Sequence, residues 1–231
     1  MPTARETLLD TALAALGEQH WSAVRMVDVA VRARVSRQTL YNEFGSKEGL
    51  ARALVRREAD RYLRGVEAVL AEPGSPARGL LAVAEWTVAA AAARPVLRAL
   101  LTGAWDERLP APRPVRAGAR LAPVPEQRRA DAGVPSPGEL LGQARDRAAA
   151  LITRGPSGPS GPDGPSREGD AGDAAAVVRS CELALRLALS FVVASTGREA
   201  EGDRVRLVRD ALFPAAMHQV AGVRPPMPPG D

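Results

Sequence analysis

A short polar segment near the start of the chain carries the side chains whose types and spacing best suit a chemical role. They share the ability to form hydrogen bonds from a helix surface or a helix cap, and they are Ser36, Arg37, Gln38, Thr39, Tyr41, Asn42, Ser46 and Lys47. Gln38 can pair with adenine and Arg37 with guanine or phosphate, while Thr39 can offer its methyl group to thymine. The set therefore predicts a surface that contacts nucleic acid.

The charge around this segment suits a polyanionic partner. Cations stand at Arg32, Arg34, Arg37 and Lys47, and the acid within that span is Glu43. The whole chain of 231 residues has a formal charge of +4 and a sequence pI near 10.1. A basic face is the electrostatic footprint of phosphate contact, although a merely solvated face would explain the charges equally well. The spacing of the polar set favours the first interpretation.

Short helices must position these side chains. Ser36 is a good N-cap for a helix over 37–44, Gly45 ends that helix, and Ser46 caps another that begins at Lys47 and continues to about residue 70. A further short helix over about 26–33 precedes the turn. Leu40 and Phe44, one turn apart, are expected to face the core and leave the polar residues outward. Two short helices joined by a tight turn form a helix-turn-helix.

A first helix completes the expected module. Thr3 and Glu6 form a capping box, apolar residues then recur at helical spacing, and Gly17 is expected to end the helix. The backbone amides that start the helices at Arg37 and Lys47 can bind phosphate.

The run from Val27 to Leu50 resembles the DNA-binding signature of TetR-type (TetR/AcrR) transcriptional regulators. It contains ARVSRQTLYNEFGSKEGL from Ala33 onward, and with the first helix the resemblance covers about residues 3–65. By this resemblance and by their chemistry, Tyr41 and Lys47 are expected to act as phosphate clamps, which set the register of the protein on DNA. The chain departs from the family at two positions. Arg34 replaces the usual turn glycine, where φ is often positive, and Arg25 replaces the usual Ser or Thr cap.

The remainder of the chain predicts an all-α protein with two domains. Residues 1–50 form the helix-turn-helix domain, and residues 51–224 form a helical bundle with helices over about 77–93, 95–101, 138–153, 174–196 and 203–220. Prolines make 110–137 a long loop, and the Gly/Pro/Ser repeat makes 155–173 a disordered linker. The Pro-rich tail, 225–231, is expected to be disordered as well.

The resemblance implies that the C-terminal helices form a ligand cavity and a dimer interface. The expected cavity residues are apolar side chains within the predicted helices and beside them, namely Trp86, Leu97, Leu101, Trp105, Leu141 and Phe191. Scarce polar groups there favour a small hydrophobic or aromatic effector. The expected dimer contacts lie on the last two helices, at Cys181, Leu185, Ala188, Val192, Val208, Leu212 and Ala215. A homodimer would place two recognition helices about 34–36 Å apart, which predicts a palindromic DNA operator.

Other classes of protein find little support in the sequence. His20 and His218 have no motif around them, and Cys181 lies in an apolar helix, so neither catalysis nor metal binding is predicted and no cofactor is expected. No apolar run is long enough to cross a bilayer, and no secretory signal precedes the first helix, so the expected location is the cytoplasm. A DNA-binding architectural protein that responds to no ligand stays open as the alternative.

Overall fold

Helices make up nearly all the regular structure of the protein. The computed structural model describes residues 3–112, 133–154, 168–194 and 210. In chain order the helices are α1 (Ala4–Glu18), the 3₁₀ helix η1 (Trp21–Ala23), α2 (Met26–Arg32), α3 (Arg37–Phe44), α4 (Lys47–Leu70), α5 (Pro76–Ala93), α6 (Pro95–Thr102), α8 (Pro137–Arg154) and α9 (Glu168–Ala194). These described ranges contain no strand, which confirms the all-α prediction.

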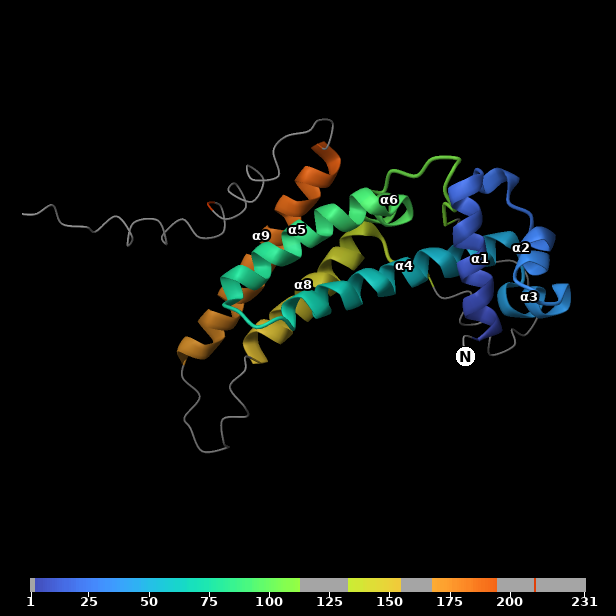
Figure 1. Ribbon diagram of the computed structural model, residues 1–231. Coiled ribbons are helices and arrows are strands. Elements are labelled where there is room, and N and C mark those ends of the chain that lie inside the picture. Colours follow the sequence, from blue (N-terminus) through green and yellow to red (C-terminus); the bar gives the residue numbers. More distant parts are fainter. Residues whose placement is uncertain (1–2, 113–132, 155–167, 195–209, 211–231) are drawn as a thin grey trace, which may run out of the picture.

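The N-terminal helices gather at one end of the molecule and form their own core (Figure 1). The predicted capping box starts α1, because the Thr3 hydroxyl accepts from the Glu6 backbone N–H and the Glu6 carboxylate accepts from the Thr3 N–H. Gly17 lies inside α1, so the predicted end at this glycine is wrong by a small margin. The side chain of Leu8, fully buried, packs in this core with Leu40 of α3.

Helix α4 belongs to both cores of the protein. Leu54 is the last residue of α4 in the N-terminal core, and Val55 is the first in the larger core of the bundle. The predicted domain boundary at residue 50 therefore falls inside one continuous helix of 24 residues. At 1.5 Å per residue this helix is about 36 Å long, so it extends from the helix-turn-helix into the bundle (Figure 1).

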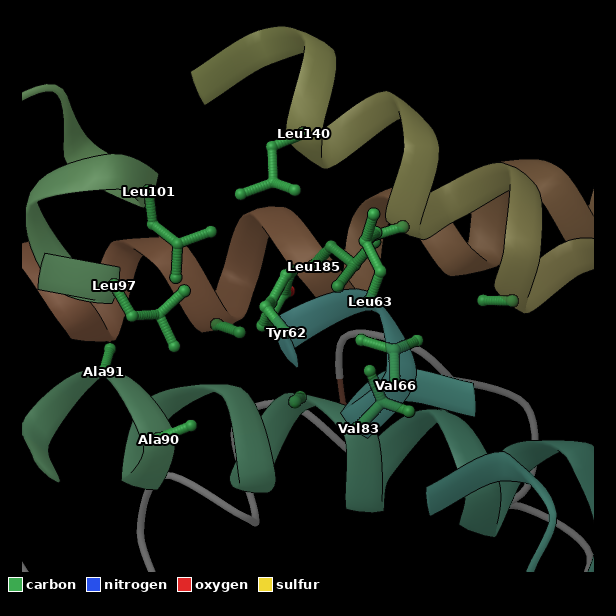
Figure 2. Close-up of a cluster of buried hydrophobic side chains, with 14 of the residues drawn as sticks. Tyr62, Leu63, Val66, Val83, Ala90, Ala91, Leu97, Leu101, Leu140 and Leu185 are labelled. Atoms are coloured by element: carbon green, nitrogen blue, oxygen red, sulfur yellow. The ribbon is translucent and has the colours of Figure 1, made fainter. Parts of the chain in front are cut away.

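The bundle packs α4, α5, α6, α8 and α9 around a shared apolar core. Figure 2 shows side chains from all five helices converging there, among them Leu63 of α4, Leu140 of α8 and Leu185 of α9. Burial of these side chains supplies the main stabilisation of this part of the chain.

A close approach between α4 and α5 fixes the position of an aromatic pair. The Trp86 ring stacks on Tyr62, with 5.6 Å between ring centroids. A Cβ atom at Gly65 would stand 2.1 Å from the Trp86 ring, so glycine is needed at this point of α4 for the ring to lie against the helix backbone.

Helices α5 and α6 meet at a sharp bend of 118° around Arg94. The Arg94 guanidinium lies 3.4 Å from the buried carboxylate of Glu58 on α4 and over the Trp86 ring. Burial lowers the pKa of Arg94, and the nearby Glu58 carboxylate opposes that shift. Within the described part of the chain, no single helix is both long and apolar enough to cross a membrane, and the α5–α6 pair passes such a test only when both helices are counted together across the bend.

The C-terminal third differs from the sequence-based expectation at one point. Helix α9 begins at Glu168, so the last residues of the predicted 155–173 linker are helical. The physical reason is that the last proline of that segment is Pro165, and nothing after it prevents a helix. The rest of the linker, most of the 110–137 loop, the 203–220 helix except Asp210, and the 225–231 tail lie outside the described residues.

Candidate nucleic-acid interface

Helix α3 presents one polar face outward because its apolar face is anchored. Leu40 and Phe44 are 0% and 2% exposed, as the one-turn spacing predicts. The side chains that then lie exposed on α3 are those of Arg37, Gln38, Tyr41 and Asn42, and Thr39 is half-buried. Tyr41, at 44% exposure, is therefore not a core aromatic.

Hydrogen bonds order the polar face of α3. The Gln38 amide donates to the Asn42 Oδ1 at 2.9 Å, so two side chains one turn apart lie in line along the exposed face. At the start of the helix, the Ser36 Oγ accepts from the Thr39 backbone N–H and lies 2.8 Å from the Thr39 hydroxyl. The Ser36 cap thus engages Thr39, while the Gln38–Asn42 pair lies on the exposed face of the helix.

The turn before α3 shows both departures from the family pattern. Arg34 has φ +54°, and it is the non-glycine residue with positive φ among those described, so the conformation expected of a turn glycine is kept despite the substitution. Arg25 occupies the N-cap position of α2 without a side-chain hydrogen bond, as expected from the loss of a Ser or Thr cap. Both arginine side chains are exposed beside the turn.

The junction between α3 and α4 depends on two glycines. Gly45 ends α3 with φ +70°, and the Ser46 Oγ accepts from the Gly49 N–H to start α4. A Cβ atom at Gly49 would lie 1.8 Å from the Phe44 carbonyl oxygen, so only glycine lets α4 approach the end of α3 this closely. Gly49 was not among the functional residues predicted from the sequence. Its position three residues after a capping serine was the available signal.

Lys47 makes contacts inside the chain. Its Nζ donates to the Ser22 backbone carbonyl at 3.0 Å and lies 5.2 Å from the centre of the Trp21 ring, both in the η1 segment. Burial lowers the pKa of Lys47, and the nearby Glu48 carboxylate partly opposes this. Lys47 is thus held against η1 rather than on the polar face of α3, and a role as a phosphate clamp requires it to leave or share these contacts.

Ion pairs neutralise some arginines of the N-terminal helix-turn-helix and not others. Arg32 forms a two-point pair with Glu18, with both N–O distances at 2.8 Å, and Arg5 pairs with Glu43 at 3.1 Å. Arg25, Arg34 and Arg37 form no ion pair with any residue that the structure describes. The positive charge left unneutralised therefore lies around the turn and the start of α3, where phosphate contacts are predicted.

A backbone hydrogen bond also joins the N-terminal helix-turn-helix to the bundle. The Trp21 backbone N–H donates to the backbone carbonyl of Arg108, 3.0 Å away in the segment after α6. This segment therefore lies against η1, which also holds Lys47. The sequence offered no signal for the contact, since backbone groups are present at every position.

The six predicted cavity residues belong to the bundle core or pack against it. Leu97 and Leu101 are buried in the bundle core, and Trp86, Trp105, Leu141 and Phe191 are partly buried against it. Of these six, Trp105 lines a cavity described among the residues of the structure. Trp86 instead fills the gap between α4 and α5. A shared ligand cavity for these six residues stays a prediction.

Four of the predicted dimer contacts on α9 are buried within the single chain. Cys181, Leu185, Ala188 and Val192 are at most 3% exposed in a single chain, because this side of α9 packs against α5 and α8. They cannot form a surface for a second copy without unpacking the bundle. Val208, Leu212 and Ala215 lie outside the described residues.

No group of three or more His, Cys, Asp or Glu side chains in the described ranges has the arrangement of a metal site. Burial raises the pKa of the Cys181 thiol to about 11, so this sulfur is protonated and shielded at neutral pH.

Comparisons with known proteins agree with this geometry. Residues 8–54 match the family described as bacterial regulatory proteins, tetR family. The HTH-type transcriptional regulator AlkX of Mycobacterium tuberculosis is 41% identical over 128 residues, which cover 52% of this chain and 61% of that protein. The match thus spans less than two thirds of the relative's length.

Two solved structures share the fold. A TetR/AcrR-family transcriptional regulator from Thermobifida fusca is 17% identical, with a TM-score of 0.54 and coverage of 95% of this chain and 98% of that one. A tetR-family regulator from Streptomyces coelicolor is 18% identical, with a TM-score of 0.51 and coverage of 95% and 85%. Residues 8–54 thus match the tetR family of bacterial regulatory proteins, and the chain shares with these two structures the fold of an N-terminal helix-turn-helix followed by a helical domain.

Proposed function

We propose that the protein is a sequence-specific, DNA-binding transcriptional regulator that acts in the cytoplasm as a dimeric repressor. In this proposal it binds a palindromic operator and is released by a small hydrophobic ligand. The tetR-family match over residues 8–54 and the helix-turn-helix geometry support DNA binding, and the size of the helical bundle supports a sensing role.

One observation carries the proposal most directly. The polar face of α3 holds Arg37, Gln38, Tyr41 and Asn42 outward, while Leu40 and Phe44 fix the helix to the core. Gln38 and Asn42 are the two side chains able to read base edges through paired donors and acceptors. Arg37 and Tyr41 flank them and can contact phosphates, which sets the register of the helix on the duplex.

The proposed dimer uses a different face of α9 from the one first expected. Leu183 and Val193 are large apolar side chains with exposures of 41% and 64% in the single chain. Exposed apolar groups of this size on a helix favour a contact with another protein surface. A second copy that packs α9 against α9 would cover them and place two α3 helices on one DNA molecule.

Selection of bound sequences from random DNA tests the proposal in one step. We expect a recovered sequence with two inverted half-sites about one helical turn apart. Gln38→Ala and Asn42→Ala should each reduce the preference for the selected operator by about tenfold, because each good base contact contributes about 1–3 kcal/mol of discrimination. Gln143→Ala, at an exposed glutamine on α8, is the matched control and should leave the preference unchanged.

The alternative is an architectural DNA-binding protein. It predicts similar affinity for all DNA sequences, with no recovered motif and no effect of Gln38→Ala on relative affinities. Recovery of a single asymmetric half-site by a monomeric protein would refute the dimer and the palindrome while leaving sequence-specific binding intact.

A further inference from the structure

Two exposed arginines flank α2. Arg25 is the residue directly before this helix, and Arg34 follows the last residue of the helix by two positions. Neither arginine forms a salt bridge with a residue in the described ranges 3–112, 133–154 and 168–194 or with residue 210. Within this part of the chain, each guanidinium therefore keeps its positive charge and its N–H donors for an external partner.

The helix between these arginines lies beside α3. Helices α2 and α3 share one core at the end of the molecule away from α9 (Figure 1). When a helix-turn-helix binds DNA, its second helix enters the major groove and its first helix crosses the phosphate backbone. With α3 in the groove, α2 therefore crosses one strand. Its seven residues span about 10.5 Å, and the phosphates of one strand follow every 3.4 Å or about that along the axis, so arginines at its two ends can reach different phosphates.

Two other cations of the helix-turn-helix are engaged inside the chain. Arg32, the last residue of α2, forms the two-point ion pair with Glu18. The Lys47 Nζ donates to the Ser22 carbonyl at 3.0 Å and lies over the aromatic ring of η1. A phosphate contact by Lys47 would replace these interactions, whereas the two arginines beside α2 give up no ion pair that the structure describes.

The backbone conformation of Arg34 is a separate observation in favour of a role for its side chain. Its φ of +54° costs free energy for a residue with a Cβ atom and none for glycine. Residues held in such conformations cluster at functional sites. The turn itself would form more easily with glycine, so the guanidinium of Arg34 is the part of this residue that local structure does not explain.

We propose that Arg25 and Arg34 bind DNA phosphates on the two sides of α2, and that they take the role that Lys47 does not fill. This inference rests on the proposed function and names residues that hold the DNA backbone in it. Lys47 is then a positioning residue, which holds η1 against the start of α4. Backbone contacts carry no sequence information, so the two arginines set affinity and orientation while Gln38 and Asn42 read the bases.

The salt dependence of DNA affinity measures phosphate contacts. The full-length protein is titrated into a fluorescein-labelled duplex of arbitrary sequence, roughly three helical turns long, and the association constant is measured by anisotropy between about 50 and 200 mM KCl. Each phosphate contact contributes about 0.9 to the slope of the logarithm of this constant against the logarithm of salt concentration. Arg34→Gly and Arg25→Gln should therefore each lower the slope by about 0.9 per bound subunit, and Lys47→Gln should leave it unchanged.

Further variants separate charge from fold. Glycine adopts the φ of residue 34 without strain, so a loss of affinity in Arg34→Gly does not come from a disturbed turn. Arg34→Lys keeps the charge and should keep the wild-type slope. Arg98→Gln, at an exposed arginine on α6, is the matched control and should change neither slope nor affinity. A wild-type slope in either Arg34→Gly or Arg25→Gln, or a slope lowered by about 0.9 per subunit in Lys47→Gln, would overturn the assignment.

The slopes are measured on DNA of arbitrary sequence, so their failure can be told apart from failure of the proposed function. If operator selection recovers a motif while the arginine variants keep the wild-type slope, the regulator stands and these phosphate contacts are wrong. If the slopes fall as expected and selection recovers no motif, the two arginines bind phosphate in an architectural DNA-binding protein. Absence of binding to the duplex at low salt would refute both proposals.

Discussion

Replacing Gly49 by alanine tests how α4 fixes the recognition helix. The new Cβ atom would lie 1.8 Å from the Phe44 carbonyl oxygen, and ordinary contact begins at 3.4 Å, so these atoms must separate by about 1.6 Å. Helix α3 has eight residues and is about 12 Å long, so this shift at its C-terminal end tilts it by about 8°. Such a tilt moves Gln38 and Asn42 relative to the helices that support them.

The change in the free energy of unfolding caused by Gly49→Ala is the balance of two effects. Overpacking against the backbone costs about 1–3 kcal/mol, and alanine in a helix returns about 1 kcal/mol relative to glycine. We expect Gly49→Ala to lower the free energy of unfolding by up to about 2 kcal/mol and to weaken operator binding at least tenfold. Urea unfolding followed by circular dichroism and fluorescence anisotropy with operator DNA measure the two quantities.

Gly142→Ala is the matched control for this change. Gly142 lies in the middle of α8, and a Cβ atom there would meet nothing within 4 Å. The control should therefore raise the free energy of unfolding by up to about 1 kcal/mol and leave DNA binding unchanged. If Gly49→Ala behaves like Gly142→Ala in both assays, the close approach does not hold α3 and our reasoning is wrong.

Four further predictions concern single side chains. Arg34→Gly should raise the free energy of unfolding by about 1 kcal/mol in urea titrations, because glycine adopts φ +54° without strain; a loss would contradict this. Arg94→Met should cost about 2 kcal/mol, because the buried Glu58 carboxylate keeps only the Arg61 guanidinium, 3.8 Å away, and adding Glu58→Gln should recover part of the loss, whereas additive losses would refute the pairing. Burial raises the pKa of Tyr62 to about 12, so its folded-state phenol stabilises the protein fully below pH 10 and progressively less toward pH 12. Between pH 9 and pH 11, the free energy of unfolding of Tyr62→Phe should therefore fall by about 1 kcal/mol less than that of the wild type. Parallel curves of stability against pH would contradict this. Cys181 should react with a disulfide reagent at pH 8 only after unfolding, and rapid labelling of the native protein would show that the thiol is accessible.

The local signals of the sequence were sufficient for the helices around the polar face. Ser36 and Gly45 set the ends of α3, and Ser46 sets the start of α4, because a capping side chain and a positive φ act within a few residues of themselves. The expected positive φ at Arg34 follows from the same kind of local rule.

Contacts between distant parts of the chain were not predictable in this way. The apolar stripe of α9 that includes Leu185 has the same spacing whether it faces its own bundle or a second copy, so periodicity could not place it. A lysine usually lies on the surface, yet the Lys47 ammonium lies against the Trp21 ring because η1 folds back toward α4.

The bond between the Trp21 N–H and the Arg108 carbonyl joins two main-chain groups. Replacing either side chain by alanine removes neither the donor nor the acceptor. An alanine scan would therefore not detect this connection between η1 and the segment after α6. Only a substitution that alters the backbone itself, such as Trp21→Pro, deletes the donor. Related chains can therefore change both side chains and still retain the link, which makes it compatible with extensive divergence in the bundle.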